Sequence, residues 1–340
     1  MPANSWIFMH FRFHRSLLSR VIFVWFALLL SWSAAVAEPK TPAVLTDVGG
    51  YTLNSVLLEP KGRAELPPIV FIHGASTSLY DPIFSFREKL EGRAQLLFVD
   101  RPGHGRSDVG GAANTLPDGQ ADAIATLMEK RGIKKAIIVG HPYGGAVAAA
   151  FALNHKDKVL GLVLLSPAVY PWPGGVAWYY QAARAPVLGW VFSGLVVPAV
   201  GLVAMNTAID AVFAPNKRPD TYISETKAMQ SLQPAAFRHN AKEIANLQDW
   251  TKRVSPRYPE IKVPTIIITG DTDDIVSPEI HSRQLSRAIK GSELIVVRNL
   301  GHKSDYIAND LAVAAIEKIA GKRRNLKAIA RQVEKRIAGD

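Results

Sequence analysis

The feature that most constrains this chain is the glycine-rich hexapeptide Gly140-His141-Pro142-Tyr143-Gly144-Gly145. A short apolar run at 136–139 precedes it, and a run of small and apolar residues at 146–151 follows it. This order predicts a strand, a tight turn flanked by glycines and a helix, in which the turn raises one side chain above a parallel sheet. The raised residue is Pro142, at the position where the pattern G-x-S-x-G has a serine.

Strands and helices alternate along most of the sequence. Largely apolar runs of strand length lie at 69–72, 95–99, 159–165, 265–269 and 293–297, and a helical pattern covers 118–132. Runs that are apolar on both faces are typical of parallel strands with helices on both sides of the sheet. The sequence therefore predicts an α/β fold with a doubly wound, mostly parallel sheet.

The alternation stops between about 170 and 250, where no charged residue lies between Arg184 and Asp210. Taken alone, Val187 to Met205 is apolar enough to cross a membrane, which takes about 20 residues. A crossing would separate the last predicted strands from the turn at 142, and glycines and Pro198 interrupt the run. We therefore expect an inserted helical cap at 170–250, core segments at 38–169 and 251–320, and a basic C-terminal helix at 321–340.

Residues 1–37 have the pattern of a signal peptide. Arginines at 12, 15 and 20 precede the apolar run 21–30, and Ala35-Val36-Ala37 resembles a cleavage site. The run is shorter than the ~20 residues of a membrane span. We expect an exported protein, periplasmic or secreted, with an uncleaved N-terminal membrane anchor as the alternative. The sequence has no cysteine, so the chain carries no thiol that an oxidising compartment would convert to a disulfide.

The formal net charge of +11 is concentrated in the C-terminal tail, and we expect no nucleic-acid partner. Leu326, Ile329, Val333 and Ile337 recur there at helical spacing among lysines and arginines. A basic amphipathic helix of this kind can make a peripheral contact with an anionic membrane. The alternative is a terminal helix that packs its apolar stripe on the body of the protein.

Polar segments follow the predicted strands at the end where open α/β sheets place their sites. In chain order they are His73-Gly74-Ala75-Ser76, 100–107, the turn at 140–145, 270–278 and Asn299-Leu300-Gly301-His302. They carry the motifs H-G, D-x-P-G-H-G-x-S, G-H-x-Y-G-G, G-x-x-D-x-I-V and G-H. From about residue 42 to 318 the chain thereby resembles the α/β-hydrolase fold family. Within the family it looks most like the capped esterases, lipases and cofactor-free haloperoxidase-like hydrolases.

The resemblance implies a hydrolase of small apolar acyl or ester-like substrates, with His302 as general base. A neutral imidazole near pH 7 can take and return a proton. Asp273 would orient the imidazole and stabilise its protonated form. Asp271 and Asp274 are close rivals, but Asp273 fits the G-x-x-D spacing.

The resemblance also implies an oxyanion hole formed by the backbone N–H groups of Ala75 and Tyr143. Pro142 stands at the nucleophile position. Proline has no nucleophilic atom, so a seryl acyl-enzyme cannot form. Its φ is fixed near about −65°, whereas the family's nucleophiles have positive φ, so the turn must relax.

Three functions stay open at this point. The first is an ester hydrolase lineage in which Pro142 is a local variant or a sequence error. In the second, His302 and Asp273 act as a general base without a covalent step. In the third, the protein is a pseudoenzyme that binds an apolar ligand in the capped pocket. We expect no metal or organic cofactor, because the sequence lacks H-E-x-x-H, cysteine pairs and a G-x-G-x-x-G after a strand.

Overall fold

In the computed structural model, which describes residues 42–339, eight strands form one sheet in the order β1-β2-β4-β3-β5-β6-β7-β8. The first two strands are antiparallel additions, and β4, β3, β5, β6, β7 and β8 are mutually parallel. The strands are β1 (Val44–Asp47), β2 (Thr52–Leu58), β3 (Ile69–Ile72), β4 (Leu96–Val99), β5 (Ala136–Gly140), β6 (Val159–Leu165), β7 (Thr265–Gly270) and β8 (Glu293–Val297). The predicted fold class is confirmed.

Helices cover both faces of this sheet. They are α2 (Tyr80–Leu90), α3 (Pro117–Lys130), α4 (Tyr143–Asn154), α10 (Ser282–Ala288), α11 (Ser304–Ile307), α12 (Asn309–Ile319) and α13 (Leu326–Ile337), with short turns at η2 (Ala112–Thr115), η3 (Lys156–Lys158) and η6 (Ser255–Glu260). Alternate residues of each central strand point to opposite faces, so the buried side chains form two layers.

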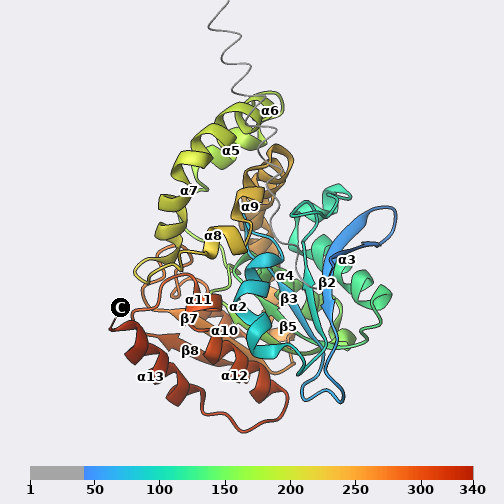
Figure 1. Cartoon of the computed structure of the whole chain (residues 1–340), viewed down its shortest axis with the longest axis vertical. Helices are drawn as coiled ribbons and strands as arrows, with labels where there is room; N and C mark the ends of the chain where they lie inside the picture. Colours follow the sequence, from blue (N-terminus) through green and yellow to red (C-terminus); the bar gives the residue numbers. More distant parts are fainter. Residues whose placement is uncertain (1–41, 340) are drawn as a thin grey trace, which may run out of the picture. The chain divides into compact units, whose positions relative to one another are not determined.

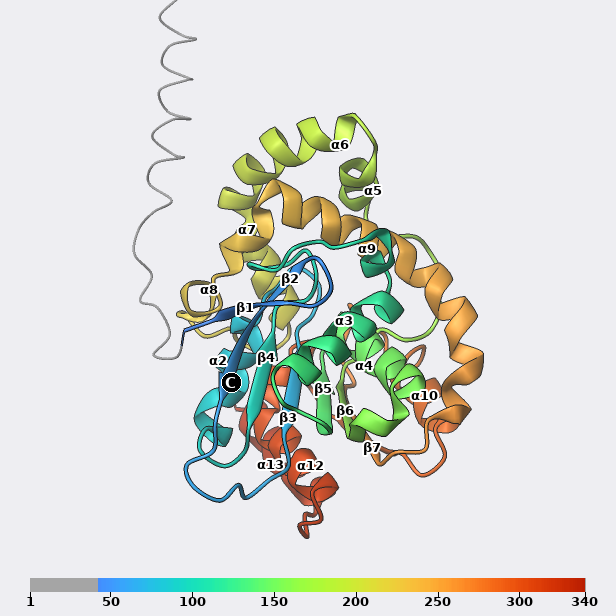
Figure 2. The same ribbon diagram turned by 90° about the vertical axis from the view of Figure 1, so that its right-hand side faces the viewer.

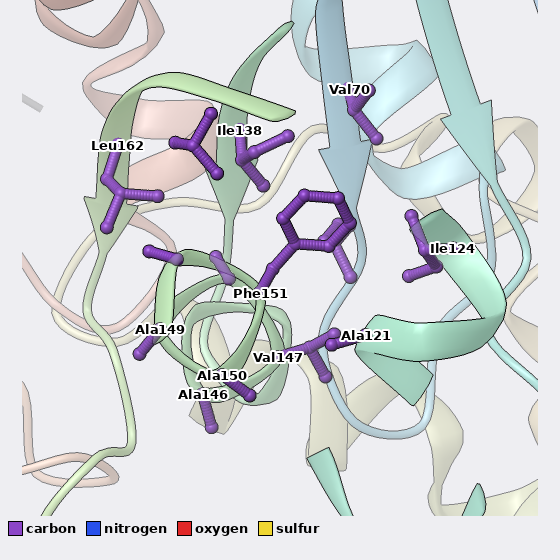
Figure 3. Close-up of a cluster of buried hydrophobic side chains, with 14 of the residues drawn as sticks. Val70, Ala121, Ile124, Ile138, Ala146, Val147, Ala149, Ala150, Phe151 and Leu162 are labelled. Carbon is purple, nitrogen blue, oxygen red and sulfur yellow. The ribbon is translucent and has the colours of Figure 1, made fainter. Parts of the chain in front are cut away.

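The first layer holds α3, α4 and α10 against the sheet. Figure 3 shows α4 end-on, with Val147 and Phe151 beside Val70 of β3, Ile138 of β5 and Ile124 of α3. The second layer holds α2, α12 and α13. The strands β3, β4, β5 and β7 are buried along their whole length, as their apolar sequences predict.

The C-terminal helix α13 belongs to the second layer. Leu326, Val333 and Ile337 of its apolar stripe are buried there, and Ile329 is partly buried. The stripe therefore packs on the body of the protein, which was the alternative to a membrane contact. The helix has no exposed apolar face left for lipid, although most of its basic side chains stay exposed.

Between β6 and β7 the chain forms the inserted helices. These are α5 (Trp178–Arg184), α6 (Leu188–Val191), the π-helical turn η4 (Phe192–Val196), α7 (Val197–Phe213), α8 (Tyr222–Glu225), η5 (Ala228–Leu232) and α9 (Pro234–Val254). Figures 1 and 2 show α5, α6 and α7 at one end of the sheet, opposite to α12 and α13, and Figure 2 shows α9 running from that end down to α10. The predicted signal peptide at 1–37 lies outside the described residues, so it stays a prediction, and so does export.

Candidate active site

The turn between β5 and α4 keeps the tight crossing that its glycines predict. A Cβ on Gly144 would lie 2.0 Å from the backbone oxygen of Ile72, and one on Gly140 would lie 2.2 Å from the oxygen of Gly144. Only glycine allows the backbones to approach this closely. Pro142 has φ −75° and ψ −38°, within the helical region. The turn therefore lacks the positive φ expected for a nucleophile there, because the proline ring fixes φ.

The ring of Pro142 packs on the loop after β3. A Cβ on Gly74 would lie only 2.5 Å from Cδ of Pro142 and 2.9 Å from the oxygen of His141. The carbonyl oxygen of Pro142 accepts hydrogen bonds from the backbone of Gly145 and Ala168, both at 3.1 Å. Residue 142 is thus held on two sides by backbone and offers only ring carbons to its surroundings.

His302 and Asp273 form a buried pair. Nδ1 of His302 lies 2.9 Å from Oδ2 and 3.1 Å from Oδ1 of Asp273. Oδ1 of Asp273 also accepts the backbone N–H groups of Ile275, at 3.0 Å, and Val276, at 2.8 Å. Three N–H groups thus fix the carboxylate, which in turn orients the imidazole ring through Nδ1.

The environment of Asp273 keeps its carboxylate charged. Burial by itself would raise the pKa of Asp273, but the hydrogen bond and charge of His302 and the N–H of Val276 outweigh burial and lower it. The rival carboxylates Asp271 and Asp274 are exposed, and Asp271 instead accepts the backbone N–H of Asn299 at 2.8 Å. Of the three carboxylates, only Asp273 meets His302, in keeping with its G-x-x-D spacing.

A cavity of about 1060 Å³ lies between this end of the sheet and the inserted helices. Pro142, His302, Ala75 and Tyr143 all line it, so the structure brings three segments that are distant in the sequence to one space. Tyr143 is the first residue of α4, so its N–H has no carbonyl one turn earlier in the helix to bind. The remaining wall is mostly apolar and includes Trp178, Tyr180, Phe192, Val200, Met205 and Phe237.

Comparison with known proteins places this arrangement in a family. The family model described as alpha/beta hydrolase fold matches residues 67–304, which is more than half of the chain. This chain belongs to the α/β-hydrolase fold family. The predicted resemblance is therefore confirmed at the level of the family.

Individual relatives are distant. A 2-hydroxy-6-oxononadienedioate/2-hydroxy-6-oxononatrienedioate hydrolase of Klebsiella pneumoniae is 24% identical over 290 residues, which are 79% of this chain and 93% of that protein. Among solved structures, the enol-lactonase from Burkholderia xenovorans LB400 has a TM-score of 0.66 at 20% identity, over 82% of this chain and 100% of that one. A thermophilic esterase from Thermogutta terrifontis has a TM-score of 0.62 at 21% identity, over 82% and 99%. At these identities the solved structures establish the shared fold.

A second buried polar cluster joins the α/β-hydrolase body to α9. The side chains of Arg101 and Glu243 are fully buried, and Nη1 of Arg101 lies 2.9 Å from Oε1 of Glu243. Arg101 also donates to the backbone oxygens of Gly74 and His73, at 2.9 and 3.1 Å, and Glu243 meets Nε2 of His104 at 2.8 Å. Burial would raise the pKa of Glu243, but the charge of Arg101 outweighs it and holds that pKa well below its usual range. The cluster thus fixes the loop that carries Ala75.

Only part of this cluster could be predicted from the sequence. Arg101 and His104 lie within the D-x-P-G-H-G-x-S motif, so their place beside the site follows from the motif. Glu243 is 142 positions further along, inside a helix with several charged residues. Nothing in its local pattern separates it from its exposed neighbours.

A third cluster, beside His302, was not predicted. Nζ of the buried Lys303 lies 2.9 and 3.0 Å from the two oxygens of Asp81 and 2.9 Å from Oδ2 of Asp305. The hydroxyl of Tyr222 donates to Oδ1 of Asp81 at 2.7 Å. Asp81, Asp305 and His141 lie close enough together to hold a metal ion, and the ammonium group of Lys303 contacts both carboxylates but offsets the charge of only one of them. The cluster is a buried ion-pair network in which two carboxylates share one ammonium group.

Proposed function

We propose that this protein hydrolyses apolar ester- or lactone-like substrates with His302 as general base and without a covalent step at residue 142. The observation that carries the proposal is the buried His302–Asp273 pair, whose geometry is complete although position 142 has no nucleophile. Nε2 of His302 has no hydrogen-bond partner in the described part of the chain, and His302 lines the cavity. That nitrogen is therefore available to a water molecule or a substrate.

The proposed reaction needs only water as the second reactant. Nε2 of His302 takes one proton from water while the oxygen adds to the substrate carbonyl carbon. The N–H groups of Ala75 and Tyr143 hold the negative oxygen of the tetrahedral intermediate. Its collapse breaks the bond to the leaving oxygen, which takes the proton back from His302. Asp273 stays ionised throughout and stabilises the imidazolium.

The substrate class follows from the cavity and from the relatives. Apolar side chains form most of the wall, so an apolar acyl or ring portion gains free energy by leaving water there. The similar proteins include one named an enol-lactonase and one named an esterase, whose substrates carry the carbonyl that such a mechanism attacks. We further propose that the inserted helices act as the cap of this cavity.

The test compares turnover of nitrophenyl esters of short and medium chain length by the wild type, His302→Ala and Asp273→Asn. General acid–base catalysis contributes about 10²–10⁴-fold, so each variant should lose activity on that scale. A wild type that turns over no ester, or whose turnover survives His302→Ala, would contradict the proposal.

A serine-directed phosphonate gives the matched control. It should leave the mass of the wild type unchanged, because no acyl-enzyme forms, and should add one label to Pro142→Ser if the serine reaches His302. Labelling of the wild type at any other hydroxyl near the cavity would show that a covalent route exists, and the non-covalent mechanism would then be wrong.

The packing of Pro142 favours a second candidate, a ligand-binding protein without turnover. The ring lies against Gly74, where the loop and the turn would otherwise flank a reacting carbonyl. This function predicts that an apolar fluorescent probe such as a long-chain acyl dye binds the wild type and His302→Ala equally, with no ester turnover by either.

A further inference from the structure

One helical stretch of the insertion is apolar on all sides over its first 18 residues, 188–205, but is covered by protein on only one side. Leu188–Phe213 is 26 residues long, has a mean hydropathy of 2.0, and only 22% of its most apolar window is buried. Among residues 42–339 it is the one helix that is long and apolar enough to cross a membrane by length and composition. A helix that is apolar all round is normally surrounded by a protein core or by lipid.

The two sides of the stretch differ in what they meet. On the inner side, Val197 and Met205 are buried and line the cavity. On the other side, five large apolar residues are exposed and form what we call the outer face: Leu188, Val191, Leu195, Leu202 and Val203. Val203 is 85% exposed and Leu188 is 72% exposed. An exposed apolar surface that continues over several helical turns marks an interaction site.

The topology excludes a transmembrane crossing. The chain leaves the sheet at β6 and returns at β7, and these two strands are parallel neighbours in which Leu162 faces Thr265. Both ends of the stretch therefore return to the same side of any bilayer. A helix of this kind can lie in the plane of the membrane interface, with its apolar side in the acyl chains.

We propose that the outer face docks on the surface of a lipid bilayer. The ends of the stretch have the charges and aromatic rings that the headgroup region favours. Arg184 and Lys217 are exposed and flank the apolar residues. Trp190 is 66% exposed, and the guanidinium of Arg238 lies 3.7 Å from its ring centre. These basic and aromatic groups favour an anionic lipid surface.

Docking in this orientation would bring the cavity to the membrane. Val196 and Val200 are 41% and 57% exposed, and both also line the cavity. Figure 1 shows α6 and α7 at the edge of the described unit, away from α12 and α13. An apolar ligand could therefore pass between lipid and cavity along these helices. The docking itself does not depend on the proposed hydrolysis.

The absence of cysteine allows a direct test on the full chain, because Val203→Cys introduces a unique labelling site. A polarity-sensitive fluorophore at this position should shift its emission to the blue when vesicles of phosphatidylcholine and phosphatidylglycerol are added. Brominated acyl chains in the same vesicles should quench it. The shift should be smaller with phosphatidylcholine alone, because the basic flanks lose their anionic partners.

Gln332→Cys on α13 is the matched control, because this residue is also exposed but lies on the basic C-terminal helix. Its label should stay unshifted and unquenched. The control is needed because the apolar run at 21–30 can bind vesicles by itself, so total binding does not identify the docking face. Adding Leu195→Glu to the Val203→Cys protein should reduce the quenching, with an unchanged thermal unfolding midpoint.

Any other result would contradict the proposal, and each such result would indicate a different contact for the outer face. Quenching at 332 but not at 203 would assign the contact to α13. A blue shift at 203 without vesicles that grows with protein concentration would assign the outer face to a second copy of the chain. A shift without vesicles that is independent of concentration would assign it to the chain's own N-terminal segment. No shift under any condition would leave the outer face without lipid contact.

Discussion

The helices α4 and α7 are both made almost entirely of small and apolar residues, yet their surroundings differ. In α4 every residue from Tyr143 to Leu153 is buried between the sheet, α3 and the loop at Pro167. In α7 only Val197, Met205 and Phe213 of 17 residues are buried. An apolar composition thus favours burial of a helix but does not decide which part of the molecule, if any, covers it. In α4 the rest of the fold covers the apolar side chains, whereas the apolar side chains on the outer side of α7 are exposed in the described part of the chain.

The largest predicted difference between the two helices is in stability. Phe151→Ala in α4 should lower the free energy of unfolding by about 3–5 kcal/mol, because it removes a ring from a close-packed core. Val203→Ala in α7 should change it by less than about 0.5 kcal/mol, because the side chain contacts little protein. Urea unfolding of both variants measures this. A loss of more than 1 kcal/mol at Val203 would mean that protein covers the outer face.

The next prediction concerns the link between the inserted helices and the body. Glu243→Ala should destabilise the protein by about 3–5 kcal/mol, because it leaves the buried guanidinium of Arg101 without its carboxylate. The control is Glu260→Ala, which removes an exposed partner of Arg257 and should have a much smaller effect, because solvent screens this pair. Equal effects would show that the buried pair does not hold α9 to the body.

A third prediction concerns pH. Burial lowers the pKa of His281 to about 4, and Nδ1 of the neutral ring accepts the backbone N–H groups of Val169 and Tyr170 at 3.2 and 3.0 Å. The unfolded chain binds this proton near pH 6.5, above the folded pKa. The stabilisation is therefore complete above about pH 6.5 and falls by about 3 kcal/mol as the pH drops to 4.

His281→Asn tests the assignment, because its amide oxygen can still accept an N–H but does not titrate in this range. The free energy of unfolding of the variant should fall less steeply than that of the wild type between pH 6.5 and 4. Parallel curves would mean that other groups, such as His104 with its pKa lowered to about 4 mainly by burial, carry the whole effect.

The smallest predicted effect concerns the contact between Gly74, in the loop after β3, and the ring of Pro142, directly before α4. Gly74→Ala should cost about 1–3 kcal/mol, because its Cβ would lie 2.5 Å from Cδ of Pro142. In the Pro142→Ser background the cost should be lower, since the contact with Cδ is removed and only the backbone contacts remain, with the oxygen of His141 at 2.9 Å and the nitrogen of residue 142 at 3.3 Å. A double-mutant cycle on unfolding free energies measures the difference. Strictly additive costs would show that the proline ring does not occupy the space beside Gly74.

Local patterns were enough to predict which candidate site residues within motifs lie close together. The G-x-x-D spacing selected Asp273 from three nearby carboxylates, and the pairing with His302 at 2.9 Å agrees with that choice. The fixed φ of proline was enough to predict the relaxed turn at 142. By contrast, neither Glu243 nor Lys303 belongs to a motif, and each acquires its partners only when distant segments pack together.

The sequence alone determined the order of strands and helices, the family, and which loops carry the polar groups, because periodicity and turn residues act over a few neighbouring positions. The tertiary structure alone decided which apolar residues are covered. Burial depends on what lies across the contact, and the sequences of α4 and α7 do not contain that information. Glu243 shows the same dependence on tertiary packing. Its side chain is fully buried, although its local sequence is like that of exposed carboxylates.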